Sequence, residues 1–478
     1  MPRRLPRPPR PLSALLAASL LVTVAWALLI PPFHAPDEDG HYAYAQSLAE
    51  NLTRPPFHDP AVTHGPQLSP SVRMAEAFAR TGSFWLVERD SQRPFWDGYA
   101  QRRYEAALRA HPPPSDRVDT AEYQSTDPPL YHAWAAIAYR VASTPNVFSR
   151  LFAMRLWTAP LVLLTVLGAW LLAGELFGPD RTLQLVVAGC VGLQPMVTFM
   201  SSGVNPDAAA LPASAFVLWL TVRVVRRKPS RRVLLALAAS LVAAVLSKTV
   251  LISLLPAAAV ALVVALRRFG RWPRRGWAVV APALIAAVVV GLAVVAAASP
   301  DSLPPVSKLG GFFNYLWSYY SPRSAWAPRV GGLPPHPFYR IWLRGAWGEF
   351  GSADVHFPSG VYKVLALVSV ATFAGAVMAL IRRRFAQDRA VLLVAGLAAA
   401  GLVLGLHVGD YAQVSRFGIT VTLGRYLLPL LPIAGVAAAV ALRNLPPRWR
   451  LHGGALVLSS MFALDLVALG LVARRFYA

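Results

Sequence analysis

The sequence predicts an all-α protein that crosses a membrane many times. Hydrophobic residues make up 55% of its 478 residues and charged residues only 14%, whereas about 25% of the residues of a soluble domain are charged. Apolar runs of roughly 17–25 residues, the length that crosses a hydrocarbon core, recur along nearly the whole chain. These observations predict a single transmembrane domain over residues 1–478.

The first predicted element is a membrane helix over Leu12 to Ile30, which follows a basic arm. We interpret it as a retained helix rather than a cleaved signal peptide, because Pro31-Pro32 ends it abruptly. A polar segment over residues 31–146 follows, and a loop of this length is usually functional. Within this first loop, Gly40 to Asn51 and Ser71 to Arg80 predict short helices that lie on the membrane surface.

Ten further apolar runs bring the expected number of spans to about eleven. They are Ser149–Phe177, Leu183–Val204, Ala208–Val225, Val233–Leu246, Val250–Leu266, Trp277–Ala298, Val361–Ile381, Ala390–His407, Arg425–Leu442 and Ala455–Val472. A second polar loop, residues 299–360, separates two of these spans and is rich in Trp and Tyr. Its aromatic rings could stack on sugar rings or form an interfacial belt.

The distribution of charge predicts the orientation of the chain. The net charge is +23, and the cations lie in short blocks between apolar runs, as the positive-inside rule expects of cytoplasmic loops. The first loop carries 14 of the 23 acidic residues and is therefore expected outside the membrane. We expect the cytoplasmic membrane of a bacterium, bound membrane lipids and no nucleic acid. The exception is Arg474-Arg475, which the count of spans leaves outside.

The segment Pro36 to His41 is the sharpest candidate site. It places Asp37, Glu38, Asp39 and His41 directly after the first membrane helix. Carboxylates beside an imidazole can deprotonate an acceptor hydroxyl, or Asp37 and Glu38 can hold a divalent cation such as Mg²⁺ or Mn²⁺. The alternative is that Asp37 caps the next helix and the other acids favour its first turn.

Two polar motifs flank predicted spans on the same outer side. Asn205-Pro206-Asp207 could direct Asp207 at the cavity of Asp37, or could simply start a helix. Asp127 and Tyr131 close the first loop around paired prolines, an arrangement that can hold a loop over a cleft or merely end it. We count Asp39, Asp127, Tyr131, Asn205 and Asp207 among the candidate substrate-binding residues.

Basic side chains at the outer ends of spans are the second group of candidates. Lys248 ends a short span, and Arg425 and Tyr426 open another. A cation at membrane depth is costly and tends to be paired, so a lipid phosphate is one candidate partner and snorkelling toward headgroups is the alternative. Asp465, inside the last apolar run, is a proton-relay candidate if the protein is a transporter.

Taken together and in order, these motifs resemble the DUF2142 family of bacterial membrane proteins. The resemblance rests on Pro36–His41, Asn205–Asp207, Trp347–Gly351 and Gly424–Pro429, and it covers most of the chain. That family is similar to the GT-C glycosyltransferases, which share a polytopic helical fold and an acidic motif on the first outer loop.

The resemblance implies a glycosyltransferase that moves sugar from a polyprenyl-phosphate donor to an envelope glycan, lipid or protein, with inversion. It implies that Asp37 is the base or a metal-associated carboxylate, with Glu38 as partner and His41 in support. Lys248 and Arg425 are expected on the outer side of the membrane at the ends of spans, and from this position we infer that they contact the donor phosphate. The alternatives are a lipid or solute transporter or flippase, and a non-catalytic envelope-assembly protein.

Overall fold

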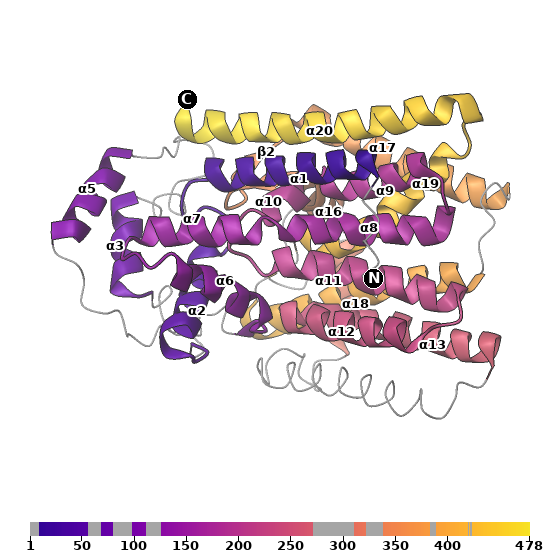
Figure 1. The fold of residues 1–478 in the computed structure, drawn as a ribbon, viewed down its shortest axis with the longest axis horizontal. Helices are drawn as coiled ribbons and strands as arrows, with labels where there is room; N and C mark the ends of the chain where they lie inside the picture. Colours follow the sequence, from indigo (N-terminus) through magenta and orange to yellow (C-terminus); the bar gives the residue numbers. More distant parts are fainter. Residues whose placement is uncertain are drawn as a thin grey trace, which may run out of the picture.

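The protein is helical throughout, apart from one short hairpin, in the part of the chain that the structure describes (Figure 1). This computed structural model describes residues 9–55, 68–79, 98–110, 126–270, 310–321, 338–382, 389–418, 420 and 423–478. The expected span Trp277–Ala298 and parts of both polar loops lie outside the described residues.

Among the described residues, eight apolar helices are long enough to cross a membrane, and they run along the long axis of the molecule (Figure 1). They are α1 (Arg10–Leu29), α7 and α8 together (Val147–Phe177), α11 (Asp207–Arg226), η2 and α13 together (Thr249–Phe269), α17 (Ser359–Ile381), α18 (Arg389–Arg416 of a helix that ends at Phe417), η4 and α19 together (Gly424–Leu442) and α20 (Pro447–Tyr477). Each coincides with a predicted span, so the all-α polytopic fold is confirmed.

The predicted span Leu183–Val204 is not one helix. It divides into α9 (Arg181–Gly192) and α10 (Pro195–Met200). The side chain of Gln194 accepts a hydrogen bond from the Val197 amide, and Pro195 occupies the first turn of α10. A cap and a proline start a new helix here, and hydropathy alone did not reveal this break.

The described helices of the first loop are α2 (Glu38–Asn51), α3 (Pro70–Ala79), α5 (Gly98–Ala110) and α6 (Leu130–Val141). The two predicted loop helices are therefore confirmed, but their expected place on the membrane surface is wrong for α2. This helix packs against α6, and Tyr42, Ala43 and Ala45 are fully buried in a core that also contains Tyr131.

The described part of the second loop contributes helices α15 (Gly311–Tyr320) and α16 (Phe338–Trp347) and a hairpin. Strands β1 (Glu349–Phe350) and β2 (Val355–His356) pair antiparallel, with Glu349 opposite His356. Phe350 stacks on Trp26 with ring centroids 5.0 Å apart, and this contact anchors the hairpin to α1. Tyr315 and Tyr319 of α15 pack with Tyr411 of α18, whereas Phe313 and Trp317 of the same helix are exposed. The stacking of aromatic rings on sugar stays a prediction for the exposed residues.

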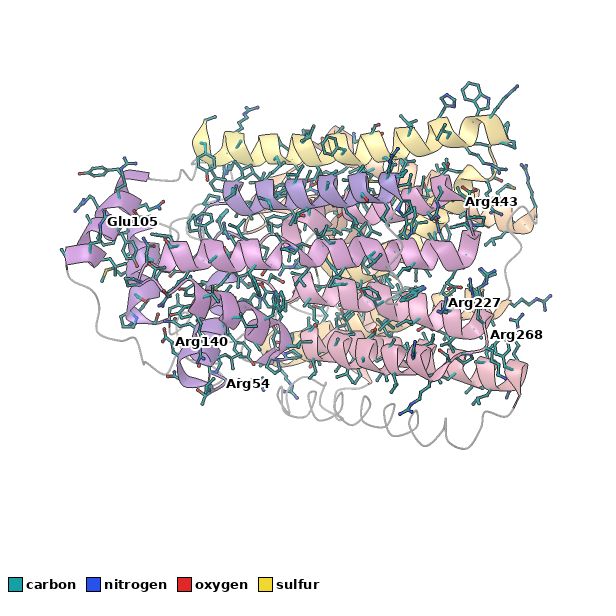
Figure 2. The ribbon with its side chains drawn as sticks, viewed as in Figure 1. Arg54, Glu105, Arg140, Arg227, Arg268 and Arg443 are labelled. Carbon is teal, nitrogen blue, oxygen red and sulfur yellow. The ribbon has the colours of Figure 1, made fainter. Side chains whose placement is uncertain are left out.

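Charged side chains divide between the two ends of the bundle. Figure 2 shows Arg227, Arg268 and Arg443 at one end and Arg54, Glu105 and Arg140 at the end formed by the first-loop helices. α20 ends at the latter, where Arg475 lies 3.6 Å from a carboxylate oxygen of Asp354 in the hairpin. Asp354 in the second loop is therefore an acidic partner for Arg475, and it accounts for the predicted exception to the positive-inside rule at the C-terminal end of the chain.

Asp465 is buried inside the bundle and forms hydrogen bonds to two other helices. One carboxylate oxygen accepts a hydrogen bond from Trp26 Nε1 at 2.7 Å and the other accepts from Thr198 Oγ1 at 2.8 Å. Both donors belong to other helices, so Asp465 joins α20 to α1 and α10. A buried polar group that is satisfied in this way stabilises one specific packing.

Candidate functional site

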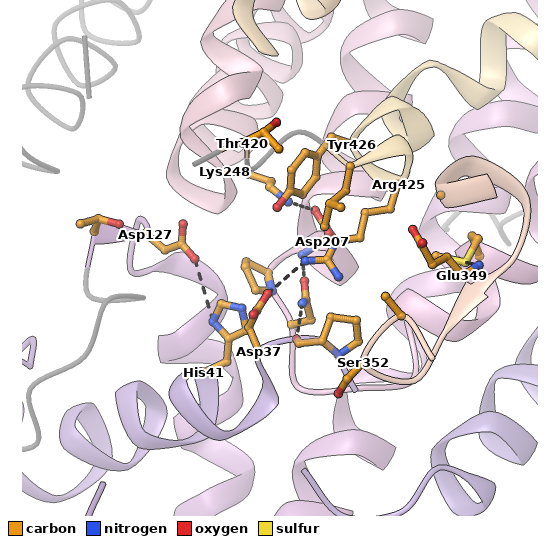
Figure 3. A pocket seen from close by; sticks show the side chains of 18 residues that line it. Asp37, His41, Asp127, Asp207, Lys248, Glu349, Ser352, Thr420, Arg425 and Tyr426 are labelled. Atoms are coloured by element: carbon orange, nitrogen blue, oxygen red, sulfur yellow. Dashed lines mark hydrogen bonds and ion pairs between the residues drawn. The ribbon is translucent and has the colours of Figure 1, made fainter. Parts of the chain in front are cut away.

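A polar cavity of about 490 Å³ opens where the first-loop helices meet the membrane bundle (Figure 3). Its walls come from the start of α2, the turn before α11, the end of α12 (Arg231–Ser247), the hairpin and η4 (Gly424–Leu430). Eight residues that the sequence singled out line it: Asp37, His41, Asp127, Asn205, Asp207, Lys248, Arg425 and Tyr426. Segments far apart in the chain thus converge on one site.

Asp37 faces the cavity and forms an ion pair with Arg425. Arg425 Nη2 donates to Asp37 Oδ2 at 3.0 Å, and the Asp37 side chain is 43% exposed. Asp37 occupies the position before α2, but its side chain makes no capping hydrogen bond and its backbone is left-handed (φ 56°). The side-chain cap is therefore wrong, whereas the expected place of Glu38 and Asp39 in the first turn is confirmed. A left-handed non-glycine residue is uncommon, and such strain clusters at functional sites.

A pair of glycines brings Arg425 to this cavity. A Cβ atom on Gly345 of α16 would lie 2.5 Å from the amide nitrogen of Gly424, and one on Gly424 would lie 2.4 Å from the carbonyl oxygen of Trp342. Only residues without a side chain permit two backbones to approach so closely. The glycine that precedes Arg425 therefore sets its position against α16.

A second ion pair lies beside the first. Lys248 Nζ bonds to Asp207 Oδ1, and Asp207 stands in the first turn of α11. Lys248 Nζ also lies 4.3 Å from the ring centre of Tyr426, and the guanidinium of Arg425 lies 5.4 Å from that ring. Two cations thus lie near the ring of Tyr426, and each is paired with a carboxylate (Figure 3). Ions in a partly buried cavity interact more strongly than ions in water.

Asn205 and Tyr131 hold the wall of the cavity together. Asn205 Nδ2 donates to the carbonyl of Pro36 at 3.0 Å, and the Asp207 amide donates to Asn205 Oδ1 at 2.9 Å. The Tyr131 hydroxyl accepts from the Asn205 amide at 2.9 Å, but Tyr131 is fully buried and does not line the polar cavity. The structure therefore places Tyr131 behind the site, as a positioning residue.

Glu38 does not line the cavity either. It is fully buried, and Arg155 binds it through Nε at 2.8 Å and through Nη2. Glu38 Oε1 also accepts from the Val204 amide at 3.1 Å. The expected partnership of Glu38 with Asp37 in catalysis or in metal binding has no geometric support. Arg155 is the residue that sequence reasoning missed, although an Arg within an apolar run was a visible signal.

Asp39 is the third acid of the segment and also lies outside the cavity lining. Burial raises the pKa of its carboxyl group to about 6. Burial, with a smaller contribution from Asp39, also raises the pKa of Glu76 on α3 to about 8. Asp39 therefore interacts electrostatically with the first-loop helices and does not line the polar cavity.

Three residues at the edge of the cavity could hold a metal ion. His41, Asp127 and His132 offer ligand atoms that all lie within 4.8 Å of one another. His41 Nδ1 is 3.1 Å from His132 Nε2 and 3.9 Å from Asp127 Oδ2. Ligands about 2.0–2.1 Å from a tetrahedral Zn²⁺ lie roughly 3.3 Å apart. The two histidines are close to that spacing and Asp127 is farther away, so the two imidazoles and the carboxylate match zinc in their donor types and would close in by a short movement of Asp127. This set fits Mg²⁺ poorly, because Mg²⁺ takes oxygen ligands.

The electrostatics of this cluster favour a neutral imidazole. Burial, with smaller contributions from Lys248 and Arg425, lowers the pKa of His41 to about 3. Burial likewise lowers the pKa of His132, and burial raises the pKa of Asp127 to about 6. Both imidazoles are therefore unprotonated near neutral pH, as a metal requires. Asp37 and Glu38, which the sequence suggested as metal ligands, each bind an arginine instead.

We predict that Zn²⁺ binding to purified protein strengthens as the pH rises through about 6, where Asp127 loses its proton. His41 contributes no change in this range because its pKa lies near 3. Titration calorimetry between pH 5 and 8 in metal-free buffer measures the affinity, and Asp127→Asn should remove the pH step. Binding that is equally tight in Asp127→Asn and in His132→Gln would exclude the site.

The cavity also contains residues that the sequence did not single out as a site. Glu349 and Ser352 come from the hairpin, Met196 from α10 and Thr420 from the segment after α18. Glu349 belongs to the Trp347–Gly351 motif, which was a visible signal. The rest lie in segments whose approach to Asp37 depends on the fold.

The fold is similar to those of two solved proteins. The apo structure of ArnT from Cupriavidus metallidurans matches 97% of this chain and 76% of its own, with a TM-score of 0.51 and 15% identity. The apo oligosaccharyltransferase of Archaeoglobus fulgidus matches 98% of this chain and 56% of its own, with a TM-score of 0.51 and 13% identity. The chain thus spans about half to three quarters of the length of these proteins. The fold and the apolar helices define a polytopic membrane protein that shares the fold of these two proteins.

The chain belongs to the DUF2142 family, described as a predicted membrane protein, whose model matches residues 20–434. None of the curated proteins matches the sequence. The family resemblance found in the motifs is therefore confirmed.

Proposed function

We propose that this protein is a membrane glycosyltransferase that transfers sugar from a polyprenyl-phosphate carrier to a hydroxyl or amide of a cell-envelope acceptor. The observation that carries the proposal is the arrangement of Asp37, Asp207, Lys248 and Arg425 in one polar cavity at an end of the bundle. A carboxylate that can take a proton stands there beside two cations that can receive a phosphate.

The chemistry follows from what each side chain can do. The sugar is already activated as a phosphate ester, so the enzyme must deprotonate the acceptor and stabilise the leaving phosphate. Asp37 is exposed to the cavity and is our candidate for the base. General-base help contributes about 10²–10⁴-fold. Arg425 and Lys248 are candidates for the phosphate, since preorganised cations stabilise charge that develops at a leaving group. A direct displacement would invert the anomeric carbon.

A metal at His41, Asp127 and His132 would supply Lewis-acid stabilisation of the donor phosphate. Without the metal, the protein's own residues still bind and orient the substrates. Asn205 keeps Asp207 and Pro36 in register, and the Arg425 pair holds the Asp37 carboxylate in the cavity.

The orientation of the charges supports an extracytoplasmic site in a bacterial cytoplasmic membrane. Arg227, Arg268 and Arg443 lie at the end of the bundle opposite the first-loop residues Arg54 and Arg140 (Figure 2), and basic ends are retained in the cytoplasm. The start of the first-loop helix α2 lines the cavity. The transporter alternative loses the feature that motivated it, because Trp26 and Thr198 already satisfy the carboxylate of Asp465.

Donor consumption tests the proposal. We expect detergent-purified protein, offered a panel of polyprenyl-phosphate sugars with a membrane-extract acceptor pool, to consume one of them. Lys248→Met should lower kcat/KM by about ten- to a hundredfold, because a hydrogen bond to a charged group is lost. Lys363→Met is the matched control, since Lys363 is exposed at the start of α17 and does not line the cavity. No consumption of any donor, with or without Zn²⁺, would contradict the proposal.

A further inference from the structure

A second cavity, of about 400 Å³, lies beside the polar one and has apolar walls. Its lining comes from α6, α8, α11 and α12, and includes Trp134, Leu164, Phe216 and Ala243. We call this feature the side groove. These helices contact one another in sequence, α8 with α11, α11 with α12 and α12 with α6, so the side groove is a space that four packed elements share.

Small residues leave the side groove open. α12 contributes Ala239 and Ala243, one helical turn apart, and α11 contributes Ala209 and Ala213. Residues four apart share a helix face, so each helix presents a strip of methyl groups to the space. Leu164 is 44% exposed. An exposed leucine on a membrane-spanning helix faces lipid, so the side groove opens toward the bilayer.

The side groove and the polar cavity share a wall. Ser247 lines the groove, and the next residue, Lys248, lines the polar cavity. Ala209 lines the groove two residues after Asp207, which lines the polar cavity. The Lys248–Asp207 ion pair therefore stands at the junction of the two spaces. A molecule with its anionic head at Lys248 has an apolar space directly beside that head.

We infer that the side groove holds the first isoprene units of the lipid carrier, with the carrier phosphate at Lys248 and Arg425. The inference rests on the proposed function for the identity of the lipid. What the inference adds is the location of the isoprenoid chain, which lies between α6 and α12 on the bilayer-facing side of the Lys248–Asp207 pair. Continuity with Lys248 favours a lipid phosphate over a neutral lipid, because a phosphate can take the place of Asp207 as the partner of Lys248 and a neutral head group cannot.

The groove orients the lipid more than it attracts it. Lipid tails are as apolar as leucine side chains, so moving an isoprenoid chain from the bilayer into the groove gains little hydrophobic free energy. Contacts with Trp134 and Phe216 instead fix the direction of the chain. A chain held in one direction presents its phosphoester to Asp37 in a defined geometry, and such positioning raises rates.

Filling the groove tests the inference. We expect Ala239→Phe and Ala243→Phe to weaken binding of a polyprenyl phosphate without sugar by about tenfold, because the added ring takes the space of the chain. Binding of geranyl phosphate, whose short chain barely enters the groove, should change less. Ala463→Phe is the matched control, because Ala463 is exposed on α20, away from the groove.

Photo-crosslinking locates the chain directly. A polyprenyl phosphate with a diazirine near its phosphate end should label peptides of α6 and α11, and unlabelled polyprenyl phosphate should displace it better than phosphatidic acid does. Labelling elsewhere, or equal displacement by phosphatidic acid, overturns the inference. Labelling at the groove without turnover of any donor would keep the inference and reject the glycosyltransferase. Turnover of a donor combined with labelling elsewhere would keep the glycosyltransferase proposal and reject the inference about the groove.

Discussion

Asp37→Asn is expected to abolish most sugar transfer while leaving the protein folded. The carboxylate faces the cavity and its removal takes away the candidate base, so the rate should fall by about 10²–10⁴-fold. Asn is nearly isosteric and can still accept a hydrogen bond from Arg425, so the wall of the cavity should survive. Single-turnover measurements with the consumed donor separate the loss of chemistry from a loss of binding.

Two comparisons sharpen that experiment. Asp180→Asn is the matched control, because Asp180 caps α9 through the Leu183 amide and Asn caps equally well. Asp37→Glu should recover part of the activity if a carboxylate is the requirement. Near-normal turnover by Asp37→Asn would transfer the role of base to another residue, with Asp207 as the next candidate.

Glu38→Gln is expected to destabilise the fold strongly, although Glu38 stands next to Asp37 in the chain. Glu38 and Arg155 are both completely buried and form a bidentate ion pair. Arg155 also donates to the carbonyls of Ala27, Ile30 and Pro31 at the end of α1. Breaking one partner of a buried pair costs about 3–5 kcal/mol, since it leaves an uncompensated charge.

Thermal unfolding in detergent measures this effect, with Glu105→Gln on α5 as a control that should change stability by less than about 0.5 kcal/mol. The double variant Glu38→Gln/Arg155→Met should be less destabilised than the sum of the two single variants, because no buried charge is left unpaired. Normal stability of Glu38→Gln combined with lost turnover would restore the catalytic assignment of Glu38.

The sequence determined the class of fold, because a hydrocarbon core imposes a length and a composition on every span. It also located the site in outline: Asp37, Asp207, Lys248 and Arg425 were each chosen as a charge at the end of an apolar run. A charge in that position is costly and must have a partner, so local reasoning finds it without knowing the partner.

Only the tertiary structure decided what each of the three consecutive acids does. The left-handed backbone of Asp37 separates it from the helix that begins at Glu38. Asp37 pairs with Arg425 at the cavity, Glu38 pairs with Arg155 in the core, and Asp39 interacts electrostatically with Glu76 of α3. Arg155 lies 117 positions from Glu38, and Arg425 lies 388 positions from Asp37. Partners at such separations are set by the packing of whole helices, and no local pattern in the chain encodes them.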